Sequence, residues 1–323
     1  MRGGAMKRRS FLAGAAALAL PLTAWRPAKA APPLNELRIG YQKIGTLLVV
    51  KARRVLEARF EAQGIEVRWV EFQFGPPLLE ALSAGAVDYG YTGDAPPIFA
   101  QAAHANLLYA AVIPARGYGQ AIIVHADSPI KTLADLKGKR VGVAKASSGH
   151  NLLIAALESA NLAWSDITPV YLAPADATAA FARGAIDAWS IWDPFLAVAE
   201  LKQNARALAV DAKAATQNSF LLVNKTFANE HGDVVAAINE EVGKSTQWAD
   251  SHRDAVAALY VEASGLDLEV QKKAVDRSEF VFGPLTDTVI AQQQAVADRF
   301  QRLGLIPAPI AVRDIVWPWK SAS

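Results

Sequence analysis

The sequence predicts an α/β fold in two lobes, each built on a mainly parallel β-sheet flanked by helices. First, strand and helix patterns alternate from residue 36 to residue 192, and the alternation runs twice. Second, a short sequence recurs, because "GAVDYGYTGDAP" (residues 85–96) and "GAIDAWSIWDP" (residues 184–194) share the opening Gly-Ala and both aspartates at an offset of 99. Third, 323 residues suffice for two domains of ordinary size.

The first series reads strand, helix, strand, helix, strand. "ELRIGY" has the pattern of a short buried strand, and "IEVRWVEF" alternates with the period of two that strands require. The intervening helix is expected to end at Gly64, and the next helix opens on two prolines and ends at Gly85. The five predicted elements cover residues 36–41, 47–63, 65–72, 76–84 and 86–92.

The second series repeats this order. Residues 139–161 read as a strand, a loop and a helix, residues 167–173 as a strand, residues 174–183 as a helix that ends at Gly184, and residues 185–192 as a strand. The first strands of both series also align, since Gly40 and Lys43 correspond to Gly142 and Lys145. Duplication explains these matches, although helix–glycine–strand junctions can resemble one another without it.

Beyond Asp211 the pattern changes to one strand, "NSFLLVNK", followed by mostly helical sequence. The segments near residues 116–124 and 206–222 are expected to cross between the lobes. The first lobe is then discontinuous, made of residues 31–118 plus 215–323, and the second lobe comprises residues 119–214.

Residues 1–30 have the pattern of an export signal. Lys7, Arg8 and Arg9 precede an apolar run that is short for a membrane anchor, and Ala28-Lys29-Ala30 forms a small-x-small cleavage pattern. "RRSFL" is similar to a twin-arginine signal, and Met6 is an alternative start. We therefore expect an exported, periplasmic protein whose signal is removed near Ala30.

Composition excludes several function classes. Without the signal, 27 Lys and Arg stand against 31 Asp and Glu, so the net basic face of a nucleic-acid-binding protein is not expected. The chain has no cysteine, so its stability cannot depend on disulfides. The five histidines are scattered, without the spacing of a metal site, and "GKST" at residues 243–246 lacks the first glycine of a phosphate-binding loop. We expect no cofactor and no metal.

Four blocks carry a likeness to a known family: "DLKGKRVGVAKASSGHNLL", "YTGDAPPIFAQAA", "YLAPADATAAF" and "AIDAWSIWDPF". In this order and spacing they resemble the aliphatic sulfonate-binding proteins of ABC importers. The resemblance implies a type II periplasmic-binding-protein-like fold with the ligand in the cleft between the lobes. It also implies an organic sulfonate as ligand, an ABC permease as partner, a role in sulfur acquisition, and no enzyme activity; we expect a monomer.

In such sheets ligands bind beyond the carboxyl ends of the strands. Ser147 and Ser148 precede an apolar helix, and Gly45 and Thr46 stand at the equivalent place in the first series. Hydroxyl and backbone N–H donors at helix starts suit the three oxygens of a sulfonate, so we predict an anion clamp with one side in each lobe. The predicted ligand-binding residues are Gln42, Gly45, Thr46, Gly93, Asp94, Ser147, Ser148, Gly149, His150, Trp189, Trp192 and Asp193.

The two tryptophans are candidates to flank an alkyl or aryl tail, with Phe74, Tyr91 and Phe220 as weaker ones. A regular strand cannot direct both Trp189 and Trp192 into the cleft, and Trp192, at the strand exit, is favoured. The alternative for each is ordinary core packing.

Several charged residues have open roles. Asp94 and Asp193 are expected to cap the helices that follow, and one or both also to touch the ligand or join the lobes. Asp88 and Asp187 are expected to serve the helix–strand turns. Lys43, Lys145 and Arg116 are the candidate steering cations, and His150 either donates to the ligand or faces solvent.

Alternative functions share the fold. These are receptors for taurine, nitrate or sulfate esters, an interaction-only role, and an enzyme similar to thiamine-pyrimidine synthases. The tryptophans favour an organic tail over nitrate, and the missing cysteines disfavour the enzyme, whose relatives carry a cysteine-rich motif. For a receptor, we expect ligand binding to shift the lobes toward a closed form.

Overall fold

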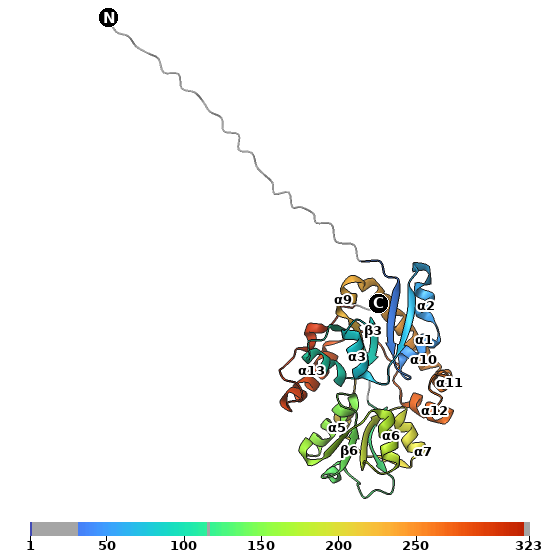
Figure 1. Cartoon of the computed structure of the whole chain (residues 1–323), viewed down its shortest axis with the longest axis vertical. Helices are drawn as coiled ribbons and strands as arrows, with labels where there is room; N and C mark the ends of the chain where they lie inside the picture. Colours follow the sequence, from blue (N-terminus) through green and yellow to red (C-terminus); the bar gives the residue numbers. More distant parts are fainter. Residues whose placement is uncertain (2–31, 115–116, 320–323) are drawn as a thin grey trace. The chain divides into compact units, whose positions relative to one another are not determined.

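The structure is a computed structural model of the 323-residue chain, and it describes Met1 and residues 32–114 and 117–319 (Figure 1). The predicted export signal, residues 1–30, lies outside the described residues apart from Met1. Residues from Pro33 onward form one unit that contains two five-stranded sheets. Within the described ranges, no helix has the length and apolar character needed to cross a membrane.

The first sheet has the strand order β2-β1-β3-β10-β4. Its strands are β1 (Glu36–Tyr41), β2 (Glu66–Glu71), β3 (Tyr89–Thr92), β4 (Leu107–Ile113) and β10 (Ser219–Asn224). β1 is parallel to β2 and to β3, whereas β10 is antiparallel to both of its neighbours. The strand predicted after residue 211 therefore lies inside the first sheet, between β3 and β4.

Helices cover both faces of this sheet, and each face has its own buried core. One face packs against α1 (Thr46–Ala52), α2 (Val55–Phe60), α10 (Gly232–Ser251) and α11 (Arg253–Ser264). The other packs against α3 (Gly75–Ser83), α4 (Ala95–Ala102) and α13 (Asp287–Arg302). Alternate residues of β10 serve the two cores, as strand geometry requires. α9 (Lys225–Glu230) and α12 (Leu268–Arg277) complete what we call the first lobe.

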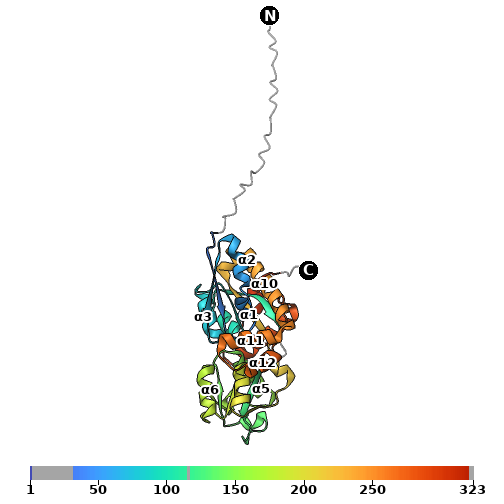
Figure 2. The same cartoon turned by 90° about the vertical axis from the view of Figure 1, so that its right-hand side faces the viewer.

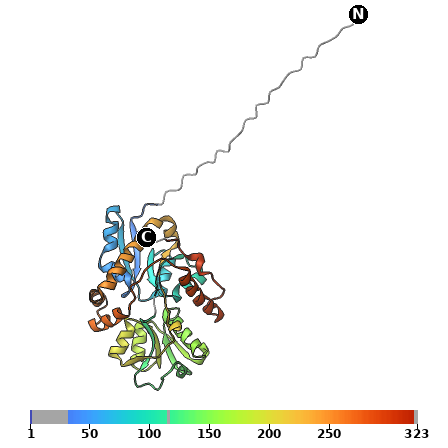
Figure 3. The same cartoon turned by 180° about the vertical axis from the view of Figure 1, so that it is seen from behind.

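The second sheet has the order β7-β6-β8-β5-β9. Its strands are β5 (Gln120–His125), β6 (Arg140–Val143), β7 (Thr168–Tyr171), β8 (Ala188–Trp192) and β9 (Ala205–Ala207). α5 (Ser148–Ser159) packs on one face, and α6 (Pro174–Ala182) and α7 (Phe195–Lys202) pack on the other (Figure 3). With α8 (Ala212–Ala215), these elements form what we call the second lobe; α7 also packs against α12 (Figure 2).

The two sheets have equivalent topology. In each, the three strands of the strand–helix–strand series are parallel, with the first strand in the middle, and an antiparallel strand follows the third. The duplicated sequence thus corresponds to a duplicated arrangement, with β1, β2 and β3 matching β6, β7 and β8.

The repeated Gly-Ala-x-Asp sequence builds the same turn in both lobes. Gly85 and Gly184 end α3 and α6 with positive φ angles of 72° and 68°, which glycine adopts without strain. Asp88 then accepts hydrogen bonds from the backbone N–H of Arg38 at 2.8 Å and from its guanidinium Nε at 3.0 Å. Asp187 holds Arg140 in the same way, at 2.8 and 3.1 Å. Each aspartate ties the third strand of its series to the first, as expected for residues that serve the turn.

One predicted helix is divided. The segment predicted as a single helix over residues 47–63 forms α1, α2 and a short 3₁₀ turn, because Arg54 takes a left-handed conformation with φ 54°. α1 packs on α10, whereas α2 packs on β2, so the break lets the segment serve two partners. "GKST" at residues 243–246 lies inside α10, away from any strand end.

Replacing Asp88 by alanine is expected to lower the free energy of unfolding by about 2–3 kcal/mol, because it leaves the Arg38 N–H and guanidinium without their buried acceptor. The equivalent Asp187→Ala should cost less, since the Asp187 side chain is 30% exposed and that of Asp88 only 4%. Urea denaturation of both variants measures the two losses. Equal losses would contradict a dependence on burial.

Candidate functional site

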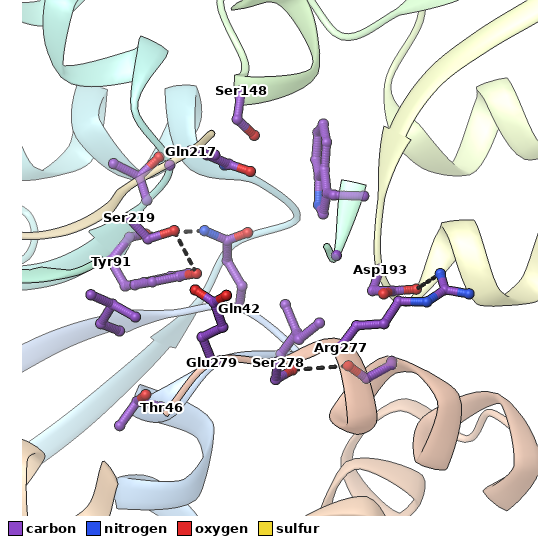
Figure 4. A pocket seen from close by; sticks show the side chains of 18 of the residues that line it. Gln42, Thr46, Tyr91, Ser148, Asp193, Gln217, Ser219, Arg277, Ser278 and Glu279 are labelled. Carbon is purple, nitrogen blue, oxygen red and sulfur yellow. Dashed lines mark hydrogen bonds and ion pairs between the residues drawn. The ribbon is translucent and has the colours of Figure 1, made fainter. Parts of the chain in front are cut away.

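A pocket lies between the two lobes, at the carboxyl ends of their parallel strands (Figure 4). Four strand ends contribute to it, within residues 42–46, 92–94, 145–150 and 189–193. The predicted residues that line it are Gln42, Gly45, Thr46, Gly93, Ser147, Ser148, Trp192 and Asp193. The turns at Gly45–Thr46 and Ser147–Ser148 therefore line the same space, one from each lobe.

Neutral donors stand on both sides of this pocket. Ser147 caps α5: its hydroxyl accepts from the His150 N–H at 3.3 Å and donates to the Ala144 carbonyl at 2.7 Å. Ser148, the first residue of α5, directs its hydroxyl into the pocket. Thr46 is buried at the start of α1, whose first turn has no side-chain cap. Uncapped N–H groups and hydroxyls at helix starts are suited to an anion.

A chain of hydrogen bonds forms the first-lobe wall. The Gln42 amide donates to the Tyr91 carbonyl at 3.0 Å, and the Tyr91 hydroxyl donates to Ser219 Oγ at 3.2 Å. Burial raises the pKa of Tyr91, so its phenol stays protonated near neutral pH. Tyr91, a weaker candidate in the sequence, thus lines the pocket.

Four predicted residues do not line the pocket: Asp94, Gly149, His150 and Trp189. Trp189 is 1% exposed and packs against Phe181 and Phe195 in the second-lobe core, so the strand alternation directs Trp192, not Trp189, to the pocket. Gly149 lies beneath Trp192, where an added Cβ would come 3.3 Å from its indole ring.

His150 is buried between the lobes, neither a pocket residue nor solvent-facing. Its ring stacks parallel to Phe99 of α4 at 6.4 Å and meets Trp164 edge-on at 4.9 Å. Burial, with a smaller effect of Lys145, lowers the pKa of His150 to about 4. The imidazole is therefore neutral at physiological pH.

Asp94 joins the two lobes. One carboxylate oxygen accepts from the Ala95 N–H at 2.7 Å at the start of α4, and the other accepts from the Asn151 amide of α5 at 2.6 Å. The predicted capping role is thus combined with a contact across the lobes. Burial raises the pKa of Asp94 to about 7, in spite of these donors.

Asp193 occupies the equivalent place in the second lobe and also reaches across. Its Oδ1 accepts from the Ala197 N–H at 3.0 Å and lies 3.4 Å from the guanidinium of Arg277, at the end of α12. Arg277 also pairs with Glu200 of α7. Burial raises the pKa of Asp193 to about 7, and Arg277 opposes the shift.

The other candidate cations and aromatics lie elsewhere. Lys43 pairs with Glu71 at 3.3 Å, and the Lys145 ammonium lies 5.8 Å from the centre of the Tyr171 ring. Phe220 is in the core, Phe74 does not line the pocket, and Arg116 is outside the described residues.

The C-terminal helices make a third contribution to the pocket, which was not predicted from the sequence. The end of α12 and the segment after it supply Arg277, Ser278, Glu279 and Phe280, and α11 supplies Tyr260. These residues follow no recognisable strand end, so no local pattern marked them. Gln217 and Ser219 also line the pocket. They belong to the second predicted crossing between the lobes, residues 206–222, which was not predicted to be part of the site.

This geometry, two topologically equivalent α/β lobes with a polar pocket between them, defines the class of periplasmic-type solute-binding proteins. The sequence profile of the NMT1/THI5-like family matches residues 59–256. A protein of Escherichia coli K12 named as an aliphatic sulfonates-binding protein is 41% identical over 88% of this chain and 89% of its own length. One of Bacillus subtilis 168 with the same name is 36% identical over 88% and 86%. The chain belongs to the family of aliphatic sulfonate-binding proteins.

Solved structures confirm the type II periplasmic-binding-protein-like fold. The alkanesulfonate-binding protein SsuA of Xanthomonas axonopodis pv. citri, bound to MOPS, is 39% identical with a TM-score of 0.82, covering 90% of this chain and 99% of its own. The periplasmic aliphatic sulphonate binding protein SsuA of Escherichia coli is 39% identical with a TM-score of 0.81, over 90% and 94%. The desulfurization enzyme DSZB shares the fold alone, at 18% identity and a TM-score of 0.65 over 88% and 96%.

Asp94 is expected to make stability fall as the pH rises from about 4 to about 7. An aspartate whose pKa is raised on folding holds a proton that the unfolded chain releases, so the folded state is disfavoured above the ordinary value of 3.8. His150, whose pKa is lowered on folding, acts in the opposite direction over the same range. Asp94→Asn removes only the first effect, so the variant should gain stability relative to the native protein between pH 4.5 and pH 7.5. Urea midpoints at both pH values test this, and a constant difference between the proteins would contradict it.

Proposed function

We propose that this chain is a periplasmic solute receptor that binds an organic sulfonate between its lobes and delivers it to an ABC permease for sulfur acquisition. It acts as a monomer without catalytic activity, and its export signal is removed near Ala30. Its lobes are residues 31–118 plus 215–323 and residues 119–214. The Escherichia coli, Bacillus subtilis and Xanthomonas axonopodis relatives described above are named for sulfonate binding, which supports the ligand class.

The observation that carries the proposal is the convergence of neutral donors from both lobes on one pocket. The start of α5, with Ser147 and Ser148, faces it from the second lobe, and Gly45 and Thr46 face it from the first. A sulfonate spreads one negative charge over three oxygens, so several neutral donors stabilise it without a dedicated lysine. The half-buried indole of Trp192 supplies apolar surface for the tail.

Closure follows from the same geometry. Donors from one lobe alone can satisfy only part of the headgroup, so the ligand gains most when the lobes meet around it. The Asp94–Asn151 and Asp193–Arg277 contacts bridge the lobes beside the pocket and exist only when these elements are close. The ligand thereby favours the closed arrangement, which the permease recognises.

Ser148→Leu and Thr46→Leu are each expected to weaken sulfonate binding at least a hundredfold, about 2.7 kcal/mol, because an isobutyl group replaces a donor in the headgroup site. Isothermal titration calorimetry of the signal-free protein with butane-1-sulfonate measures the loss. Buffers must be free of sulfonates.

Ser165→Leu is the matched control, since Ser165 is exposed and does not line the pocket. It should bind like the native protein, and circular dichroism should show all three variants folded. Unchanged affinity in folded Ser148→Leu would refute the assignment of this residue.

A ligand panel separates the related functions. The taurine-binding periplasmic protein of Escherichia coli K12 is 30% identical over 54% of this chain, so taurine is the nearest alternative. Thermal shifts with butane-1-sulfonate, taurine, nitrate and sulfate should be largest for the alkanesulfonate. A larger shift with taurine or nitrate would reassign the receptor.

A further inference from the structure

The two equivalent aspartates, Asp94 and Asp193, differ in one respect that bears on the ligand. Both carboxylate oxygens of Asp94 accept hydrogen bonds, and Asp94 does not line the pocket. Asp193 does line it, and only its Oδ1 is engaged, by Ala197 and Arg277. Among the described residues, no donor lies within hydrogen-bond distance of the buried Asp193 Oδ2.

An unpaired carboxylate oxygen is costly at this place. The Asp193 side chain is 4% exposed, and a buried acceptor without a donor loses the hydrogen bonds that water would supply. Its Oδ2 lies next to Gly119, another pocket residue, where an added Cβ would come 3.7 Å away. Figure 4 shows the carboxylate at the pocket edge, with one oxygen turned toward Arg277 and the other away from it.

An ionised Asp193 would repel an anionic headgroup, whereas a protonated Asp193 could donate a hydrogen bond to it. Because Oδ1 already accepts two donors, the proton belongs on Oδ2, from which it can be donated to a ligand oxygen. The acid form then adds one more neutral donor to those of Ser148 and the start of α5. Building on the proposed function, we propose that Asp193 binds the sulfonate as a carboxylic acid, through Oδ2–H, so that ligand binding is coupled to a proton.

The charges around Asp193 come from two helices, α12 and α7. Arg277 and Lys273 of α12 favour its ionised form, Glu200 of α7 opposes it, and burial opposes it most strongly. The balance places its pKa at about 7, within the physiological range. Burial raises the pKa of the pocket phenols Tyr91 and Tyr260 above 10, so they stay neutral between pH 6 and pH 9. Among the described residues that line the pocket, the remaining charged one is Glu279.

The test is the affinity for butane-1-sulfonate between pH 6 and pH 9, in phosphate and Tris buffers. This ligand has no group that titrates in the range, so any change belongs to the protein. We expect binding to weaken at least about tenfold from pH 6.5 to pH 9 as Asp193 ionises. At pH 8, calorimetry in two buffers of different ionisation enthalpy should detect uptake of about one proton per ligand bound.

Asp193→Asn is the decisive variant. An asparagine can keep its oxygen toward Ala197 and Arg277 while its NH₂ replaces the acid O–H, so it should bind as the native protein does at pH 6, with no pH dependence up to pH 9. Asp94→Asn tests the other source of a proton: Asp94, whose pKa is also raised to about 7, joins the lobes without lining the pocket. A pH dependence that came from this contact would disappear in Asp94→Asn and persist in Asp193→Asn.

The outcomes are distinguishable. If native protein binds no sulfonate at any pH, the proposed function fails. If it binds with the same affinity and no proton uptake across the range, only the role of Asp193 fails. A folded Asp193→Asn protein that does not bind, or one that keeps the native pH dependence, overturns the proposal as well. Should Asp193→Asn not fold, the native proton uptake alone decides.

Discussion

The architecture depends on how the third strand of each series is fixed to the first. Asp88 returns to the start of β1 and Asp187 to the start of β6, each holding a backbone N–H and a guanidinium from the neighbouring strand. This contact sets the register at the amino ends of the parallel strands, and the strand lengths then set where the carboxyl ends fall. The pocket residues that lie at the ends of these parallel strands are therefore positioned relative to the two aspartate contacts.

The second aspartates of the repeat, Asp94 and Asp193, occupy equivalent positions in the two lobes. Their surroundings nevertheless differ. Asp94 follows β3 after Gly93, accepts a hydrogen bond from the amide of Asn151, and becomes part of the contact between the lobes. Asp193 follows β8, meets Arg277 from the C-terminal helices, and remains at the pocket. In both copies of the repeat the second aspartate thus accepts from a backbone N–H of the helix that follows. The contact with the opposite lobe differs, and only Asp193 lines the pocket.

The sequence predicted the features that are coded locally. Strand periodicity, glycine stops and the repeat located the parallel strands, the equivalent turns and the four strand ends that meet at the pocket. Strand alternation also favoured Trp192 over Trp189 for the pocket. The sequence pattern could not place His150, because the burial of this histidine depends on Phe99 and Phe300 from distant helices of the first lobe. Nor could it identify Arg277, since a helix end has no signal that specifies which distant strand it will meet. The break at Arg54 was not predicted for the same reason, since α1 and α2 pack against different distant elements and no local sequence pattern marks this.

Gly93 limits how closely the two lobes can approach each other. It follows β3, and a methyl group built there would stand 2.8 Å from Ser148 Cβ and 2.8 Å from the Gln217 amide. A larger residue at this position would therefore push β3 away from the start of α5. The width of the pocket between the lobes is thus sensitive to a single substitution at Gly93.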